Sequence, residues 1–100
     1  MGKYNVSLTG RALQDLDDIY TYIAQTLLVP ETALKLVDEI ETEILSLEDM
    51  PYRFPERKTG SYANRGYRQI FVGNYTIIYR VDETNRQVII VTVRYTHSQF

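Results

Sequence analysis

The eight residues VRYTHSQF place an arginine, a tyrosine and the only histidine of the chain close together. Arg94, Tyr95 and His97 follow directly on an apolar run that is typical of a strand. Guanidinium groups hold phosphate in a fork, and an imidazole moves protons near neutral pH. With Arg68 and Arg80 as further cations, this set favours metal-independent attack on a phosphodiester. The alternative is that these are ordinary solvated strand residues without a catalytic role.

Other kinds of chemistry lack the residues that they need. The chain has no cysteine and one histidine, so disulfides, thiolate catalysis and the usual zinc sites are excluded. It has neither a strand–GxGxxG–helix unit nor a GxxxxGK[ST] loop, and no GxSxG motif. We therefore expect no metal and no cofactor.

Length and composition predict a single domain over residues 1–100. No apolar run approaches the roughly 20 residues that a membrane helix needs, and the first residues lack the apolar region of a signal peptide. We expect a cytoplasmic protein without a membrane partner.

The net charge of −2 conceals an uneven distribution. Residues 1–50 carry three basic and ten acidic side chains, whereas residues 51–100 carry eight basic and three acidic ones. A basic half of this kind favours a polyanion or an acidic partner. The competing explanation is that helices favour glutamate and strands tolerate arginine.

The first half of the chain predicts a short strand and then a helical hairpin. KYNVSLT alternates polar and apolar residues, and Thr9 or Ser7 can cap the helix that follows. Pro30 ends that helix and suits the first turn of the next one. The hairpin should span roughly residues 10–49. Its two apolar stripes should pack together: Leu13, Leu16, Ile19 and Ile23 against Ala33, Val37, Ile40 and Ile44.

The second half predicts a loop and three strands. GYRQIFV, YTIIYRV and QVIIVTVRY read as an antiparallel meander, with Gly73-Asn74 as a two-residue hairpin turn. Strands segregated from a helical pair indicate an α+β fold with the hairpin on one face of a small, mainly antiparallel, curved sheet.

Alternation along the strands sorts side chains by face. The helix-covered face should hold Tyr75, Ile77, Tyr79, Val81, Ile89, Val91 and Val93. The other face should hold Thr76, Ile78, Arg80, Val88, Ile90, Thr92 and Arg94. Arginines beside aliphatic residues on an uncovered sheet predict a docking surface.

Several stretches in this order resemble the RelE/ParE superfamily of toxins from bacterial type II toxin–antitoxin systems. They are LQDLDDIYTYIA, VPETA, ILSLEDMPYRFPE, YRQIFVGNYTIIYRV and VIIVTVRYTH, and they cover nearly the whole chain. The resemblance implies a curved sheet with a helical hairpin, and growth inhibition that a co-expressed antitoxin silences. It also implies one of two targets: RelE-like members cut messenger RNA on the ribosome, and ParE-like members inhibit DNA gyrase.

Individual positions place the chain closer to the ParE-like branch. RelE-like nucleases usually carry an arginine three residues before the strand tyrosine that Tyr79 matches, and this chain has Thr76 there. Arg68 matches an arginine common in the ParE-like branch. ParE-like chains often end in an Arg-Asp pair, and this one reads Ser98-Gln99-Phe100.

The function that we predict from this resemblance is ParE-like inhibition of a protein target such as DNA gyrase. The alternative is a ribosome-dependent nuclease whose catalytic residues would be Arg68, Arg80, Arg94, Tyr95 and His97. A third possibility is a binding module that has lost toxicity. The predicted antitoxin contact consists of Ile78, Arg80, Ile90 and Arg94, and no sequence-specific DNA binding by the toxin alone is expected.

Overall fold

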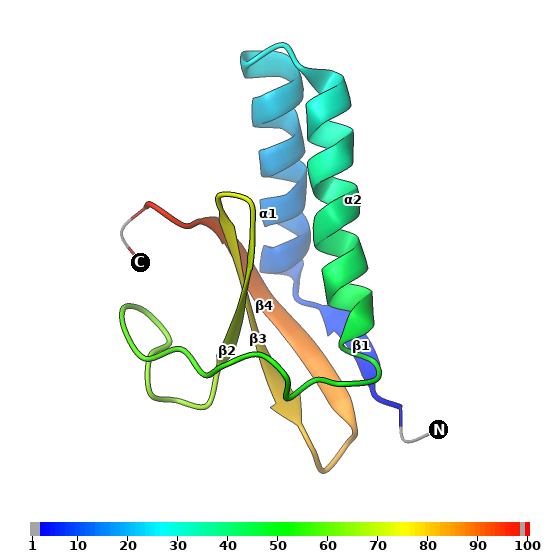
Figure 1. Ribbon diagram of the computed structural model, residues 1–100, viewed down its shortest axis with the longest axis vertical. Helices are drawn as coiled ribbons and strands as arrows, with labels where there is room; N and C mark the ends of the chain where they lie inside the picture. Colours follow the sequence, from blue (N-terminus) through cyan, green and yellow to red (C-terminus); the bar gives the residue numbers. More distant parts are fainter. Residues whose placement is uncertain (1–2, 99) are drawn as a thin grey trace.

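The computed structural model describes residues 3–98 and 100 and shows a helical hairpin packed on a four-stranded sheet (Figure 1). Along the chain the elements are β1 (Asn5–Leu8), α1 (Gly10–Thr21), a π-helical turn (Tyr22–Thr26), α2 (Pro30–Ser46), β2 (Arg68–Val72), β3 (Tyr75–Asp82) and β4 (Gln87–Tyr95). The predicted α+β fold is confirmed, and so is the order of its elements.

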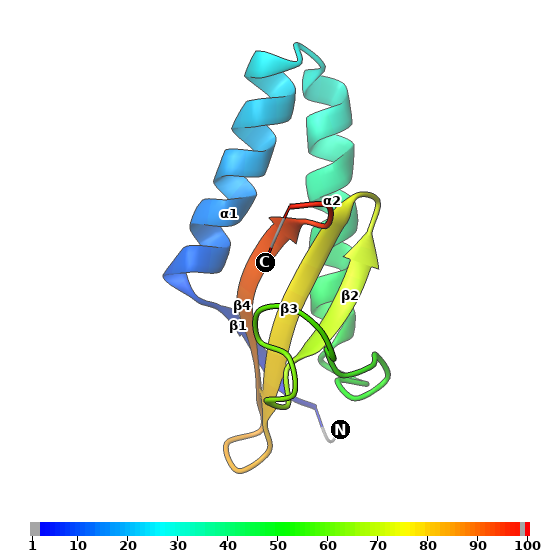
Figure 2. The ribbon, with the colours of Figure 1, turned by 90° about the vertical axis from the view of Figure 1, so that its left-hand side faces the viewer.

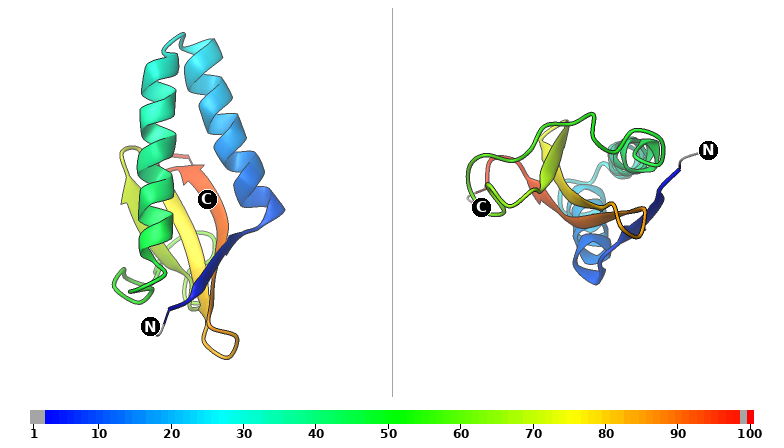
Figure 3. Two further views of the ribbon diagram at one scale, coloured as in Figure 1. Left: turned by 90° about the vertical axis from the view of Figure 1, so that its right-hand side faces the viewer. Right: turned by 90° about the horizontal axis from the view of Figure 1, so that it is seen from below.

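The sheet has the strand order β1-β4-β3-β2. The three C-terminal strands form the predicted antiparallel meander, and β1 adds to the edge of β4 in parallel (Figure 2). Seen from the side, the hairpin covers one face of the sheet and extends past its end (Figure 3). This extension leaves the distal half of the hairpin without a complete sheet beneath it.

The hairpin begins and turns where the sequence predicts. The Thr9 side chain caps α1 by accepting a hydrogen bond from the Ala12 N–H at 3.0 Å. Pro30 occupies the first turn of α2. Between them α1 ends in the π-helical turn, and Leu28 takes a positive φ of 59°.

Most of the predicted hairpin interface is buried: Leu16, Ile19, Ile23, Ala33, Ile40 and Ile44. Two members of the prediction are wrong. Leu13 is 57% exposed, because the buried stripe of α1 runs through Ala12 instead, one position earlier. Val37 is only partly buried.

The predicted faces are right for β3 and wrong for part of β4. The pairing shifts between Ile78 and Tyr79, so Ile78 pairs with Thr92 while Tyr79 pairs with Ile90. Val91 is the extra residue of this β-bulge, and a bulge reverses the alternation beyond it. The helix-side core therefore receives Val88, Ile90 and Val93, in place of Ile89, Val91 and Val93.

The sequence predicted that the second face of the sheet is uncovered, and this prediction is wrong. Ile78 and Thr92 lie on that face and are fully buried. The loop between α2 and β2 passes over it (Figure 2). Arg57 of this loop donates to the Gln69 side chain of β2 at 2.9 Å and to the main-chain oxygen of Phe100 at 2.9 Å.

A polar cluster lies at the turn between β3 and β4. Tyr4 and Tyr52 each donate a hydroxyl hydrogen bond to Glu83, at 2.8 and 2.6 Å, and Arg86 pairs with the other carboxylate oxygen at 2.8 Å. The hydrogen bonds from Tyr52 and Tyr4 lower the pKa of Glu83 below its ordinary value of 4.5. The bond to Glu83 also raises the pKa of Tyr52 to about 12.

This cluster predicts an acid-sensitive contribution to stability. A carboxylate whose pKa is lower in the folded chain stabilises it above the unfolded pKa, and that contribution disappears as pH falls through the folded pKa. Between pH 5 and about pH 3, urea unfolding of the Glu83→Gln variant should therefore depend less steeply on pH than that of the wild type. Parallel slopes for the two proteins would contradict the role assigned to Glu83.

Candidate functional site

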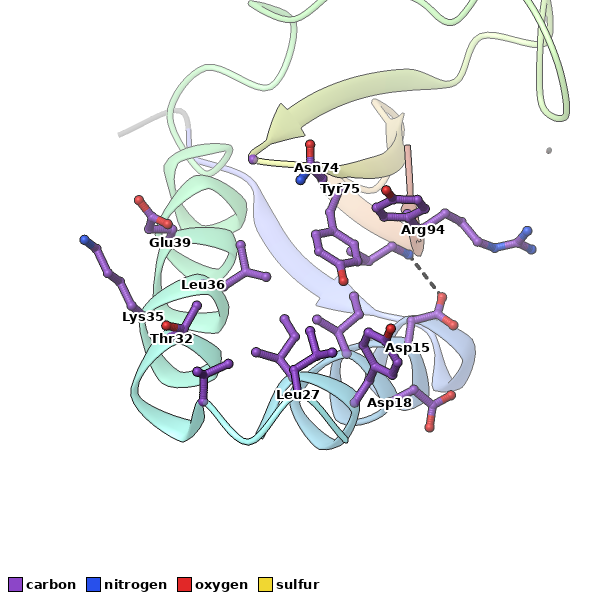
Figure 4. Close-up of a pocket in the computed structure, with 17 residues that line it drawn as sticks. Asp15, Asp18, Leu27, Thr32, Lys35, Leu36, Glu39, Asn74, Tyr75 and Arg94 are labelled. Carbon is purple, nitrogen blue, oxygen red and sulfur yellow. Dashed lines mark hydrogen bonds between the residues drawn. The ribbon is translucent and has the colours of Figure 1, made fainter. Parts of the chain in front are cut away.

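A groove of about 1000 Å³ opens between the distal half of the hairpin and the end of the sheet (Figure 4). We call it the hairpin groove. The hairpin contributes the apolar side chains Ile19, Tyr22, Ile23, Leu27, Val29 and Leu36, and the sheet contributes Tyr75, Val93 and Tyr95. Asp15, Asp18, Thr32, Lys35, Glu39, Gly73, Asn74 and Arg94 complete the lining.

The groove is apolar at its centre and charged at its rim. The Tyr75 ring points into the space between sheet and hairpin, toward Leu27 and Leu36 (Figure 4). Burial raises the pKa of its hydroxyl. Tyr22, Leu27, Val29 and Tyr95 are all substantially exposed. An exposed apolar patch with a polar rim is typical of a protein interaction site.

Asp15 holds one wall of the groove in place. Strand β1 pairs with β4 only as far as Ile90, so the edge of β4 is free beyond that residue. Asp15 accepts the Val93 N–H at 3.1 Å, the bond that is dashed in Figure 4, and also the Thr92 hydroxyl. Thr9 donates its hydroxyl to the Val91 oxygen at 2.9 Å. Thr9 and Asp15 thereby form hydrogen bonds with main-chain groups of β4 that have no neighbouring strand to pair with.

Arg68, the first nuclease candidate, is engaged in structural contacts. It pairs with Tyr79, so its side chain lies on the helix side of the sheet. Its guanidinium donates to the Phe54 oxygen at 2.6 Å and lies 5.1 Å from the centre of the Tyr52 ring. These contacts tie the loop after α2 to the sheet.

Arg80 and Arg94 lie on the opposite face from Arg68 and are well separated. Arg94 pairs with Thr76, and Arg80 lies four residues further along β3. At about 3.3 Å per strand residue, their main chains are about 13 Å apart. Arg80 is exposed, whereas Arg94 donates its Nε to the Thr92 hydroxyl at 3.2 Å.

Tyr95 and His97 belong to the groove side of the sheet. The Tyr95 ring makes edge contacts with Tyr75 at 5.8 Å and with His97 at 5.2 Å between ring centres. Strand alternation puts Arg94 on the other side. The structure therefore divides the five nuclease candidates among four places, with the imidazole away from Arg68 and Arg80.

The predicted antitoxin contact is divided as well. Ile78 and Ile90 each have 0% of their surface exposed, and the bulge puts them on opposite faces of the sheet. Neither offers apolar surface to a partner in this conformation. Arg80 and Arg94 share a face, and for these two the contact stays a prediction.

The sequence interpretation missed the hairpin groove and the Arg57 cluster. Leu27, Leu36 and Tyr75 fit the core-facing stripes, and nothing in their spacing indicates that the hairpin outruns the sheet. Arg57 is almost fully buried, and its guanidinium stacks 4.4 Å from the centre of the Phe100 ring. Burial lowers the pKa of Arg57.

Within residues 3–98 and 100, no three His, Cys, Asp or Glu side chains form a group that could hold a metal ion. In the same part of the chain, no helix is both long and apolar enough to cross a membrane.

Comparison with known families gives one match over almost the whole chain. Residues 6–100 match the model described as "ParE toxin of type II toxin-antitoxin system, parDE". No curated protein sequence matches this chain.

Solved structures with the same fold come from toxin–antitoxin systems. The chromosomal ParDE system from P. aeruginosa has a chain with 22% identity and a TM-score of 0.78, covering 97% of this chain and 100% of that one. The RelBE2 complex from Mycobacterium tuberculosis gives 21% identity and a TM-score of 0.66, covering 93% and 98%. The intact RelBE complex from E. coli gives 13% identity and a TM-score of 0.64, covering 95% and 99%.

Proposed function

The chain belongs to the ParE toxins of type II toxin–antitoxin systems, and we propose that it inhibits growth by binding and blocking a protein target. DNA gyrase is the predicted target. In this proposal the toxin has no nuclease activity of its own, and a cognate antitoxin neutralises it.

The observation that carries this proposal is the separation of the groups that a nuclease would need. General acid–base catalysis requires the proton carrier and the charge-stabilising cations around one reacting phosphate. His97 contacts Tyr95 on the groove side, and Arg68 donates hydrogen bonds to main-chain oxygens of the loop. Arg80 lies on the other face of the sheet. A blocking toxin needs only surface anchors, and exposed aromatic and arginine side chains serve that purpose.

We place the apolar part of the antitoxin contact in the hairpin groove. The groove is wide enough for a partner segment, and its aromatic and aliphatic walls are already assembled. Two relatives with the same fold, RelBE2 from Mycobacterium tuberculosis and RelBE from E. coli, were solved as toxin–antitoxin complexes. Arg80 and Arg94 remain the proposed contacts for acidic antitoxin residues.

Substitution of His97 tests the choice between blocking and cleavage. His97→Gln should stay fully toxic when it is expressed without antitoxin, because His97 makes one ring contact, with Tyr95, and no side-chain hydrogen bond or ion pair in the described part of the chain. If His97 instead served as a general acid or base, its loss would reduce the reaction rate by about 10²–10⁴. Colony counts after induction of the wild-type and variant genes measure the difference.

The RelE-like alternative makes the opposite prediction in the same strains. If His97→Gln abolishes toxicity and also abolishes ribosome-dependent cleavage of messenger RNA, the chain is a nuclease. Circular dichroism of the variant must first show wild-type folding.

A further inference from the structure

A second pocket, smaller and more polar than the hairpin groove, lies beside the loop between α2 and β2. Its volume is about 410 Å³. The loop residues Gly60, Ser61, Tyr62, Ala63 and Arg65 line it, together with Arg94 of β4. We call it the arginine pocket. Its lining includes two guanidinium groups and no acidic side chain.

The two arginines keep free donors. Arg65 is exposed and has no hydrogen bond or ion pair with any residue that the structure describes. Arg94 uses its Nε on Thr92, and its guanidinium lies 5.3 Å from the centre of the Phe100 ring. These contacts orient the Arg94 side chain away from the hairpin groove (Figure 4) and leave its two terminal nitrogens unpaired within the described chain.

The main chain of the loop supplies further donors. Positive φ angles alternate at Gly60, Tyr62 and Asn64, with values of 75°, 71° and 59°. Main-chain turns of this kind can direct neighbouring N–H groups toward an anion. The N–H groups of Ala63 and Asn64 are used inside the loop, on the oxygens of Gly60 and Arg57. Among the described residues, no acceptor pairs with the N–H of Ser61, Tyr62 or Arg65.

Arg57 holds this loop in a defined shape. Its Nε donates to the Ser61 oxygen at 2.6 Å, and its own main chain pairs with Tyr67 and Asn64 at 2.8 and 3.0 Å. Gly60 permits a close approach, because a Cβ there would collide with the Phe100 oxygen. The main-chain donors of the pocket are therefore positioned before any ligand arrives.

We propose that the arginine pocket binds a phosphate group. The lining residues bring together two guanidinium groups, the Ser61 hydroxyl and the N–H groups of Ser61, Tyr62 and Arg65. A carboxylate presents two oxygens in one plane, whereas a phosphate presents oxygens in a tetrahedral arrangement that matches such a donor set. The pocket shares Arg94 with the lining of the hairpin groove and with the proposed antitoxin contact. Phosphate binding by the free chain does not depend on the proposed function, because it requires neither a target nor an antitoxin.

An NMR titration of the full chain with inorganic phosphate at constant ionic strength tests the proposal. The amide signals of Ser61, Tyr62 and Arg65 should shift and reach saturation. Arg65→Gln and Arg94→Gln should each weaken binding about tenfold, because each removes a charged hydrogen-bond donor. Arg65 makes no hydrogen bond, ion pair or ring contact within the described chain, so its variant should fold normally.

Lys58→Gln is the matched control, because it removes the same charge from the same loop outside the pocket. It should change phosphate affinity less than twofold. Parallel titrations with thymidine 5′-monophosphate and with a thymidine hexanucleotide separate two sources of phosphate. Binding of the monoester alone indicates a nucleotide, and Arg65-dependent binding of the hexanucleotide indicates a nucleic-acid backbone.

Two results would overturn the proposal. The first is a set of amide shifts that rise linearly with phosphate concentration, or that acetate reproduces at equal ionic strength. The other is an equal loss of affinity in Lys58→Gln and Arg65→Gln, since that would show a general effect of positive charge.

Discussion

Replacing Ile40 with alanine is expected to lower the free energy of unfolding by about 2–5 kcal/mol. Ile40 is fully buried in the core between the hairpin and the sheet, and it belongs to the longest helix of the chain. Truncation there removes apolar contacts and leaves a cavity that two packed layers cannot readily close. Since small domains are stable by about 5–15 kcal/mol, this one substitution should remove a large share of that stability.

Urea unfolding followed by circular dichroism measures this effect. Leu45→Ala on the same helix is the control, because Leu45 is 59% exposed and its truncation should cost about 0.5 kcal/mol or less. A cost below about 1 kcal/mol for Ile40→Ala would contradict the packing of α2 described above.

Replacing Leu27 with aspartate should weaken antitoxin binding about 30-fold or more. Leu27 lines the hairpin groove and is 51% exposed in the free chain, so the substitution spares the core. In the complex the new carboxylate would be buried against apolar side chains without a partner. Central apolar anchors of interfaces typically contribute 2 kcal/mol or more, which corresponds to this loss of affinity.

Isothermal titration calorimetry with the purified cognate antitoxin gives the affinity. Leu34→Asp serves as the matched control, since Leu34 is 55% exposed on the same hairpin and lies outside the groove. It should bind within about threefold of the wild type. Equal losses in both variants would place the antitoxin elsewhere on the hairpin.

The sequence predicted the elements well because each depends on local chemistry. Helix caps and turns depend on a few neighbouring residues, as at Thr9, Pro30 and Gly73-Asn74. The apolar stripes of the hairpin follow from helical periodicity. The faces of β4 were partly wrong because a bulge depends on how two strands meet, and the composition of β4 does not mark it.

The candidate sites were less predictable than the fold, because both pockets arise from packing between distant segments. The hairpin groove exists because α1 and α2 extend past the sheet, and the arginine pocket exists because Arg57 folds a long loop over β3 and β4. Sequence patterns identified Arg94 as chemically notable, but they could not pair it with Arg65, which lies 29 residues earlier.

The central claim is that this chain inhibits a protein target without cutting RNA. The most direct measurement adds the purified chain to DNA gyrase with relaxed plasmid and, separately, to ribosomes translating a defined messenger RNA. We expect dose-dependent loss of supercoiling that the antitoxin reverses, with the messenger intact. Undisturbed supercoiling together with cleavage of the messenger on the ribosome would contradict the claim.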